Sequence, residues 1–146
     1  MAEQTEGEVQ IDASPADVLA VIKDYEAYPT WADGITKAEV MERDSKGRPI
    51  EVAFEVSRMG VGAKYTLAYK YKAKDGGVSW TTRSASGAVR DIKGEYALEP
   101  SGKGTKVTYR TTIVPAIPMM GFMKRQAEKI IIGTALDGLK KRVESL

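Results

Sequence analysis

Residues 118–146 read PMMGFMKRQAEKIIIGTALDGLKKRVESL and decide the fold of this chain. At 3.6 residues per turn, this stretch predicts one long helix with two apolar stripes. The first stripe comprises Met119, Met120, Met123, Ala127, Ile130, Ile131, Thr134 and Gly138. The second is displaced around the axis and confined to the second half, and it comprises Ile132, Ala135, Leu136, Leu139 and Val143. We therefore expect this helix to meet two different surroundings along its length.

Three glycines interrupt the predicted helix, at Gly121, Gly133 and Gly138. Each costs about 1 kcal/mol relative to alanine in a helix interior. Two explanations are open: either the rest of the fold comes very close to the helix at these positions, or space is left beneath it.

The composition indicates one domain spanning residues 1–146, since 42% of the residues are hydrophobic and 29% are charged. The net charge of +2 and the even spread of lysines argue against a nucleic-acid partner. No apolar run is long enough for a transmembrane segment, and the first residues lack the pattern of a signal peptide. We expect a cytoplasmic protein, and nothing indicates its oligomeric state.

The chain contains no cysteine and no histidine. It therefore cannot form disulfides, thiolate nucleophiles, Ser-His-Asp triads or histidine-rich zinc sites. The commonest general base near neutral pH is also missing. We expect no metal and no cofactor, and we assign no catalytic residue.

The first part of the chain predicts a strand followed by two short helical segments. Val9 and Ile11 alternate with polar residues, as in a half-buried strand. Ser14 and Pro15 have the pattern of a helix N-terminus. An aromatic segment, 25–31, follows, which we expect to break near Pro29.

From residue 35 to 114 the pattern changes to strands and tight turns. Apolar and polar residues alternate, as in Ile50, Val52, Phe54 and Val56, and turn-forming residues occur at 44–47, 60–62, 75–77 and 101–104. Short turns predict an antiparallel meander of about six strands, to which the first strand adds an edge. The whole is an α+β layout in which the last helix buries one face of the sheet.

Several motifs resemble one known family. They are Ser14-Pro15-Ala16-Asp17-Val18, Tyr28-Pro29-Thr30-Trp31, Gly94-Glu95-Tyr96-Ala97-Leu98-Glu99-Pro100, Gly104-Thr105-Lys106-Val107-Thr108-Tyr109 and the basic last helix. Together they resemble the START-like (SRPBCC) helix-grip superfamily, especially its polyketide cyclase/dehydrase and coenzyme-Q-binding branch. The resemblance implies a seven-stranded antiparallel sheet that grips the last helix. It also implies a hydrophobic pocket between them for lipids, sterols, quinones or polyketides.

The apolar faces of the predicted elements supply candidate pocket residues. We expect the cavity to be lined by Trp31, Ile35, Phe54, Tyr65, Leu67, Tyr69, Trp80, Tyr96, Tyr109, Met119, Met120, Met123, Ala127, Ile130 and Thr134. The tyrosines are informative because a buried hydroxyl normally needs a hydrogen-bond partner. The alternatives are that these aromatics only pack the core, or that their hydroxyls point out at the rim.

Residues 115–123, PAIPMMGFM, form an apolar segment directly before Lys124 and Arg125. Methionines adapt to irregular surfaces, so one hypothesis is a gate that touches a membrane transiently. The other is a loop that caps the core.

The sequence therefore predicts a domain that binds a small hydrophobic molecule, such as a lipid, quinone or polyketide-like compound. A cyclase or dehydratase acting in the same cavity is an alternative. Its inward-facing candidates would be tyrosines, threonines or the charged residues Arg58, Arg83, Arg90, Asp91 and Glu95. A protein-partner module of the ribosome or quinone-biosynthesis type is a third possibility. The sequence shows no large basic patch and no long apolar surface stripe that would support it.

Overall fold

The computed structural model describes residues 4–58, 60–116 and 121–146. Within them, seven strands form one sheet in the order β1-β7-β6-β5-β4-β3-β2, and all neighbouring strands are antiparallel. The strands are β1 Thr5–Ile11, β2 Ile35–Arg43, β3 Pro49–Arg58, β4 Val61–Tyr71, β5 Gly77–Gly87, β6 Val89–Ser101 and β7 Gly104–Pro115. The predicted meander, with the first strand added at one edge, is confirmed.

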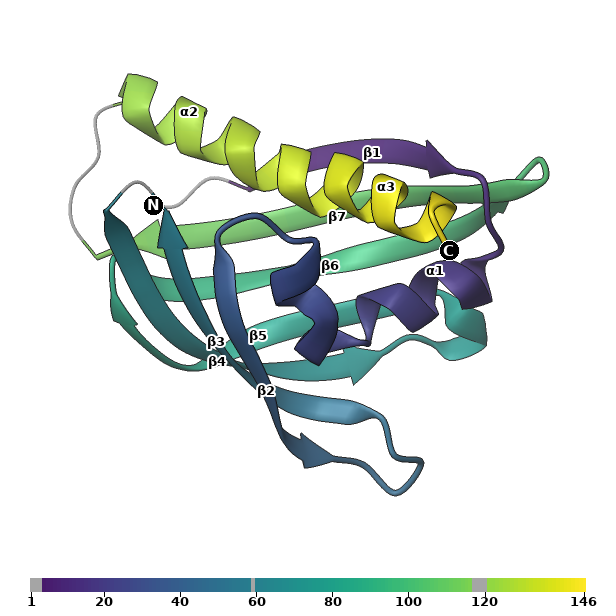
Figure 1. Ribbon diagram of the computed structural model, residues 1–146, viewed down its shortest axis with the longest axis horizontal. Coiled ribbons are helices and arrows are strands. Elements are labelled where there is room, and N and C mark those ends of the chain that lie inside the picture. Colours follow the sequence, from purple (N-terminus) through teal and green to yellow (C-terminus); the bar gives the residue numbers. More distant parts are fainter. Residues whose placement is uncertain (1–3, 59, 117–120) are drawn as a thin grey trace.

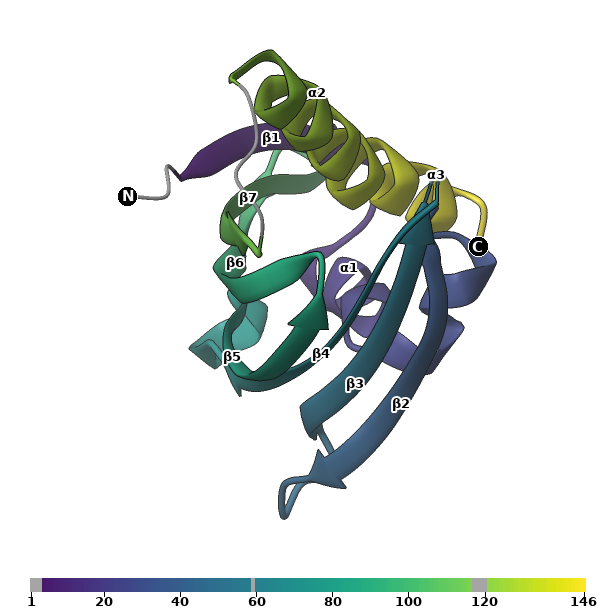
Figure 2. The same cartoon turned by 90° about the vertical axis from the view of Figure 1, so that its left-hand side faces the viewer.

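The sheet curves around the C-terminal helix. Figure 1 shows this helix lying across one face of the sheet, and Figure 2 shows that this face is concave. The two short helices α1 Pro15–Ile22 and η1 Tyr25–Thr30 cover the end of the concave face that lies near the C-terminus, and the single turn η2 Ala73–Asp75 joins β4 to β5. The predicted α+β helix-grip arrangement is therefore confirmed.

Helix α1 begins as its sequence predicts. The Ser14 hydroxyl accepts a hydrogen bond from the backbone N–H of Asp17 at 3.2 Å, and Pro15 occupies the first turn. These residues satisfy or remove N–H groups that have no partner within the helix. The apolar side of α1 is buried through Val18, Leu19, Val21 and Ile22.

The C-terminal helix runs as α2 Gly121–Ile132, η3 Gly133–Gly138 and α3 Leu139–Glu144. The sequence predicts a single α-helix from Pro118, and that starting point lies outside the described residues. The structure differs from the predicted single α-helix in the middle of the C-terminal helix. There η3 is a π-helix, a wider turn that is often found at functional sites. Two contacts hold η3: the Tyr96 hydroxyl donates to the Ala135 carbonyl at 2.9 Å, and the Trp31 ring packs against Gly138.

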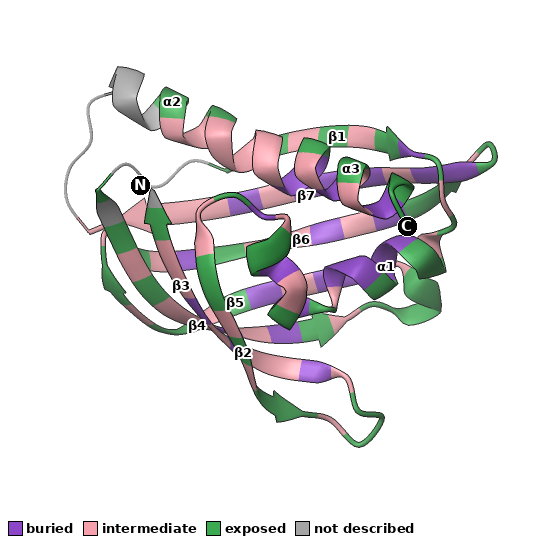
Figure 3. Ribbon diagram, viewed as in Figure 1, coloured by how far each residue is buried: buried purple, intermediate pink, exposed green. Residues whose placement is uncertain are grey.

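The two predicted stripes do meet different surroundings. In the second stripe, Ala135, Leu136, Leu139 and Val143 are buried. Ile132 and Leu136 pack on β1, where a Cβ added to Gly7 would lie only 3.0 Å from each side chain. By contrast, no described side chain between residues 125 and 134 is buried, which is visible in the middle of α2 in Figure 3.

The core therefore lies towards one end of the molecule. Its completely enclosed side chains come from β1, α1, η1 and α3, as in Ile11, Val18, Tyr25 and Leu139, and from strands β3, β5 and β7 of the sheet. The buried part of the C-terminal helix lies at this end, whereas no described side chain of α2 from residue 125 onward is buried.

Candidate functional site

The concave face carries one continuous cluster of aromatic rings. Strands β3 to β7 contribute six of the rings described, and η1 with the residue after it contributes three. Ring centroids lie 4.4 Å apart for Tyr25 and Tyr69, and 5.0 Å apart for Tyr96 and Tyr109. The members are Tyr25, Tyr28, Trp31, Phe54, Tyr65, Tyr69, Trp80, Tyr96 and Tyr109.

A glycine makes room for the indole at the centre of this cluster. Gly94 is paired with Trp80 across β5 and β6. A Cβ at Gly94 would lie 3.0 Å from the Trp80 ring and 2.3 Å from the Arg110 carbonyl oxygen. The absence of a side chain at this position therefore lets Trp80 lie flat against the sheet.

The structure brings most of the predicted cavity residues to the same face, but it buries them to different degrees. Six are buried: Phe54, Leu67, Tyr69, Trp80, Tyr96 and Tyr109. Six are partly buried: Trp31, Ile35, Tyr65, Ala127, Ile130 and Thr134. Met119 and Met120 lie outside the described residues, as does the side chain of Met123. Most of the proposed gate at 115–123 therefore also lies outside what the structure describes.

Sequence reasoning missed Tyr25 and Tyr28, which are both buried within the aromatic cluster. Tyr25 contacts the rings of Phe54 and Tyr69, and Tyr28 contacts that of Trp31. Their spacing of three residues, shared by Trp31, places all three on one side of a short helix. That spacing was the signal from which they could have been found.

Most tyrosine hydroxyls in the cluster are held by the protein itself. Tyr28 donates to the Ile22 carbonyl at 2.5 Å, and Tyr96 donates to the Ala135 carbonyl at 2.9 Å. At the edge of the cluster, Tyr71 donates to the Pro49 carbonyl at 2.5 Å, and its oxygen lies 3.3 Å from the Tyr25 hydroxyl. These four residues therefore satisfy the requirement for a partner without any ligand.

Tyr65 and Tyr69 differ from them, because neither hydroxyl makes a hydrogen bond to another residue in the described part of the chain. Burial raises the pKa of Tyr69 well above its usual value, and the nearby hydroxyls of Tyr65 and Tyr109 raise it further. Burial also raises the pKa of Tyr65, and that of Tyr109 to about 12. All three side chains are therefore neutral at physiological pH.

Tyr65 is partly buried, whereas Tyr69 is buried. Loss of hydration is the main cause of the raised pKa of Tyr65. It belongs to a middle strand and faces inward, in ring contact with Phe54 at 5.5 Å between centroids. Its accessible surface therefore belongs to the concave side of the sheet.

The charged residues considered for catalysis face away from the aromatic cluster or lie at the surface. Arg83 is exposed and pairs with Glu51 at 3.2 Å. Glu95 pairs with Lys72 and with Arg110, and the hydrogen bond from Lys72 is the main cause of its lowered pKa. Arg90 is exposed, Asp91 is partly buried and the side chain of Arg58 is not described. Among the described residues, no charged side chain is buried.

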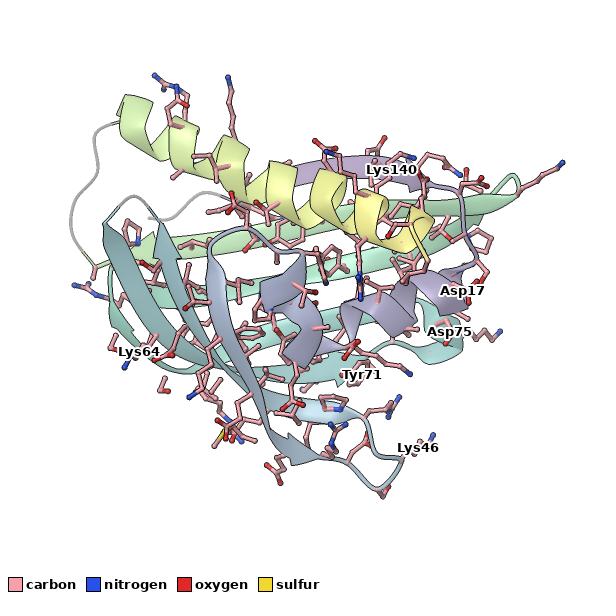
Figure 4. The ribbon with its side chains drawn as sticks, viewed as in Figure 1. Asp17, Lys46, Lys64, Tyr71, Asp75 and Lys140 are labelled. Carbon is pink, nitrogen blue, oxygen red and sulfur yellow. The ribbon has the colours of Figure 1, made fainter. Side chains whose placement is uncertain are left out.

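A shallow hollow of about 280 Å³ lies on the outer face of the sheet. The side chains around it alternate with the inward-facing Phe54 and Tyr65, and Figure 4 shows one of them, Lys64, pointing away from the C-terminal helix. Its lining comprises Lys37, Glu39, Ala53, Phe54, Glu55, Lys64, Tyr65, Thr66, Ser84, Ala85 and Ser86. It is wide open, its lining includes several charged and hydroxyl side chains, and it lies on the opposite face of the sheet from the C-terminal helix.

Neither a membrane-spanning helix nor a metal site occurs among the described residues. Among the helices formed by the described residues, none has the length and apolar character needed to cross a bilayer. The same residues contain no group of three or more carboxylates placed to hold a metal ion.

Solved structures with the same fold cover nearly the whole chain. A START superfamily protein from Mycobacterium smegmatis has a TM-score of 0.87 at 20% identity and covers 97% of each chain. The Zhui aromatase/cyclase from Streptomyces sp. R1128 has a TM-score of 0.79 at 14% identity, with 99% of this chain and 94% of that one covered. A STAR-related lipid transfer protein fragment from Xanthomonas axonopodis has a TM-score of 0.69 at 20% identity, with 95% and 84% covered.

At these identities the structural likeness establishes the fold alone. A comparison of the sequence with curated proteins finds no significant match. The sequence pattern of one family, described as polyketide cyclase / dehydrase and lipid transport, matches residues 2–144. This chain therefore belongs to the polyketide cyclase / dehydrase and lipid transport family and has the START-like helix-grip fold.

Proposed function

We propose that this protein binds a small hydrophobic molecule between the concave face of the sheet and the α2 half of the C-terminal helix. The observation that carries the proposal is the contrast in burial along one continuous helix. Ala135, Leu136, Leu139 and Val143 are buried against the rest of the protein, whereas every described apolar side chain between residues 125 and 134 is only partly buried.

Three isoleucines make this contrast informative. Ile130, Ile131 and Ile132 are the last three residues of α2, and none is buried, although Ile131 and Ile132 pack partly against the core. Fully burying a side chain of this size contributes about 1.5–3 kcal/mol. Apolar side chains that stay partly accessible at such a cost, next to the concave face of a sheet, are typical of a ligand site.

The family and its structural neighbours favour the same kind of ligand. One neighbour is described as an aromatase/cyclase and another as a lipid transfer protein, and both names refer to molecules with large apolar surfaces. The aromatic cluster offers flat ring faces to such a guest, and Trp80 lies at its centre. Binding would be driven by burial of apolar surface.

The alternative of a cyclase or dehydratase has less support from the side chains. General acid–base chemistry needs a positioned group with a suitable pKa. In the described part of the chain, no charged side chain is buried that could act as the acid or base. Arg83 and Glu95 form ion pairs outside the aromatic cluster. We therefore propose binding as the function and do not propose a reaction.

The proposal can be tested with isopropylnaphthalene, a small uncharged hydrocarbon, by isothermal titration calorimetry. Thr134→Trp places an indole on the stripe of the helix that faces the sheet. We expect it to weaken binding at least tenfold, because the indole occupies the space that the ligand needs.

The matched control is Ala53→Trp, which introduces the same indole into the hollow on the outer face. We expect Ala53→Trp to bind isopropylnaphthalene like the wild type. If the wild type does not bind the compound, the proposed function is wrong. If Ala53→Trp abolishes binding and Thr134→Trp does not, the ligand site is on the outer face.

A further inference from the structure

Two hydroxyl groups in the aromatic cluster have no partner in the described part of the protein. Tyr69 is 7% exposed, and Tyr65 lies near it on the same strand and the same face. Through ring contacts with Tyr25 and with Phe54, Tyr69 and Tyr65 both belong to the aromatic cluster of the concave face. The hydroxyls of Tyr65 and Tyr109 also disfavour ionisation of Tyr69.

Such an arrangement is unusual in a folded protein. More than nine in ten buried polar groups have a hydrogen-bond partner, and Tyr28 and Tyr96 in the same cluster follow this rule. Phenylalanine would pack as well as tyrosine at positions 65 and 69 and would avoid the loss of hydration. The hydroxyls are thus better explained by recognition of a ligand than by packing.

The surroundings of these hydroxyls also restrict the charge of the ligand. The buried polar residues in the described part of the chain are Thr105, Thr108 and Thr111, all uncharged. A carboxylate or ammonium group placed here would lose its hydration without gaining a counter-charge. Neutral tyrosines can, however, donate a hydrogen bond to a carbonyl or ether oxygen.

We propose that Tyr65 and Tyr69 determine specificity by donating hydrogen bonds to a neutral oxygen acceptor on the ligand. This inference rests on the proposed function and narrows it to uncharged ring compounds that carry a carbonyl group. Quinones and polyketide-like ketones have this chemistry, whereas hydrocarbons lack the acceptor and ionised fatty acids carry a charge.

The test uses three ligands of nearly the same shape, substituted at the same ring position: acetylnaphthalene, isopropylnaphthalene and naphthoate. They present a ketone, a hydrocarbon and a carboxylate respectively. Calorimetry gives the dissociation constant of each for the wild type, Tyr65→Phe and Tyr69→Phe. Because each substitution removes a single oxygen atom, packing of the ring is kept, and urea denaturation checks that each variant is folded.

We expect Tyr65→Phe and Tyr69→Phe each to weaken binding of acetylnaphthalene by about three- to tenfold, as loss of one neutral hydrogen bond implies. Binding of isopropylnaphthalene should be unchanged or tighter. Naphthoate should bind the wild type at least tenfold more weakly than acetylnaphthalene. Tyr71→Phe is the matched control, since its hydroxyl already donates to the Pro49 carbonyl, and it should leave all three affinities unchanged.

The outcomes separate the two proposals. If isopropylnaphthalene binds and neither Tyr65→Phe nor Tyr69→Phe affects acetylnaphthalene, the specificity role is wrong and the proposed function stands. Tightest binding of naphthoate would also overturn the specificity role. If none of the three ligands binds, the proposed function fails and this inference fails with it.

Discussion

At the scale of single residues, the tyrosines of the concave face have two different roles. Tyr96 links strand β6 to the π-helical segment η3 through its hydrogen bond to Ala135. Tyr69 lies in the same cluster, but its hydroxyl has no such bond in the described part of the chain. The same side chain can therefore stabilise the fold at one position and serve a ligand at another.

This difference predicts opposite effects of the same substitution on stability. Tyr96→Phe should lower the free energy of unfolding by about 1 kcal/mol, because it removes a buried hydrogen bond. Tyr69→Phe should leave it unchanged or raise it, because it removes a hydroxyl that lost its hydration on folding. Urea denaturation measures both, and an equal loss of stability in the two variants would show that Tyr69 is structurally bonded.

Burial of neutral tyrosines also predicts how stability depends on pH. The pKa of Tyr109 is raised to about 12, whereas an unfolded chain releases tyrosine protons near pH 10. Between about pH 10 and 12 the unfolded state therefore binds fewer protons than the folded state. The free energy of unfolding then falls as the pH rises, by about 1.4 kcal/mol per pH unit for each such tyrosine, and the contribution is fully present below pH 10.

Tyrosinate absorbance and circular dichroism, recorded over the same alkaline titration, check this. We expect most of the absorbance change to coincide with unfolding. A rise near pH 10 from all the tyrosines, with the fold intact, would mean that the concave face is open to water.

At the scale of elements, the C-terminal helix sets the architecture. Its sequence predicts two stripes in two surroundings, and in the structure the second stripe is buried except for Ile132, with Leu136 packed on β1. Of the two explanations for its glycines, close approach is not required at Gly138, where an added Cβ would make ordinary contact with the Trp31 ring at 3.7 Å. At Gly133 the space is open, because nothing lies within 4 Å of an added Cβ.

Gly133 and Gly7, the glycine of β1 that faces the helix, predict opposite effects of adding a methyl group. Gly133→Ala should raise the free energy of unfolding by about 0.5–1 kcal/mol through higher helix propensity. Gly7→Ala should lower it, because the new methyl group would press on Ile132 and Leu136 at 3.0 Å. Thermal or urea denaturation of both variants is the measurement. A loss of stability in Gly133→Ala would indicate that η3 itself requires glycine.

At the scale of the whole molecule, much of the fold could be predicted from local patterns. Alternation within Ile50, Val52, Phe54 and Val56 gave the correct inward face, and the turn residues gave antiparallel neighbours. The π-helix could not be predicted, because it depends on contacts with Trp31 and Tyr96, which are distant in the sequence.

The sequence predicted which tyrosines face the candidate site, but not which of their hydroxyls have hydrogen-bond partners. Periodicity placed Tyr65, Tyr69 and Tyr96 on one face. It could not say which hydroxyls would find a backbone carbonyl, because the Ala135 carbonyl reaches Tyr96 only after the helix has packed on the sheet. The distinction between bonded and unbonded hydroxyls, on which specificity depends in this account, needs the three-dimensional structure.

If burial of apolar surface drives ligand binding, the affinity should depend little on salt. The net charge is +2 and, in the described part of the chain, the interior is uncharged. The dissociation constant of acetylnaphthalene should therefore change by less than about twofold between low and physiological ionic strength, since screening acts on charges. Calorimetry at both salt concentrations measures it. A large loss of affinity with salt would indicate recognition of a charge.

The central claim is that the ligand lies between α2 and the concave face of the sheet. The most direct measurement is the set of intermolecular NOEs between bound isopropylnaphthalene and the methyl groups of the isotope-labelled protein. We predict NOEs to Ile131 and Thr134, on the stripe of the helix that faces the sheet. NOEs to Ala53 and Thr66, on the outer face, without any to the helix would contradict the claim.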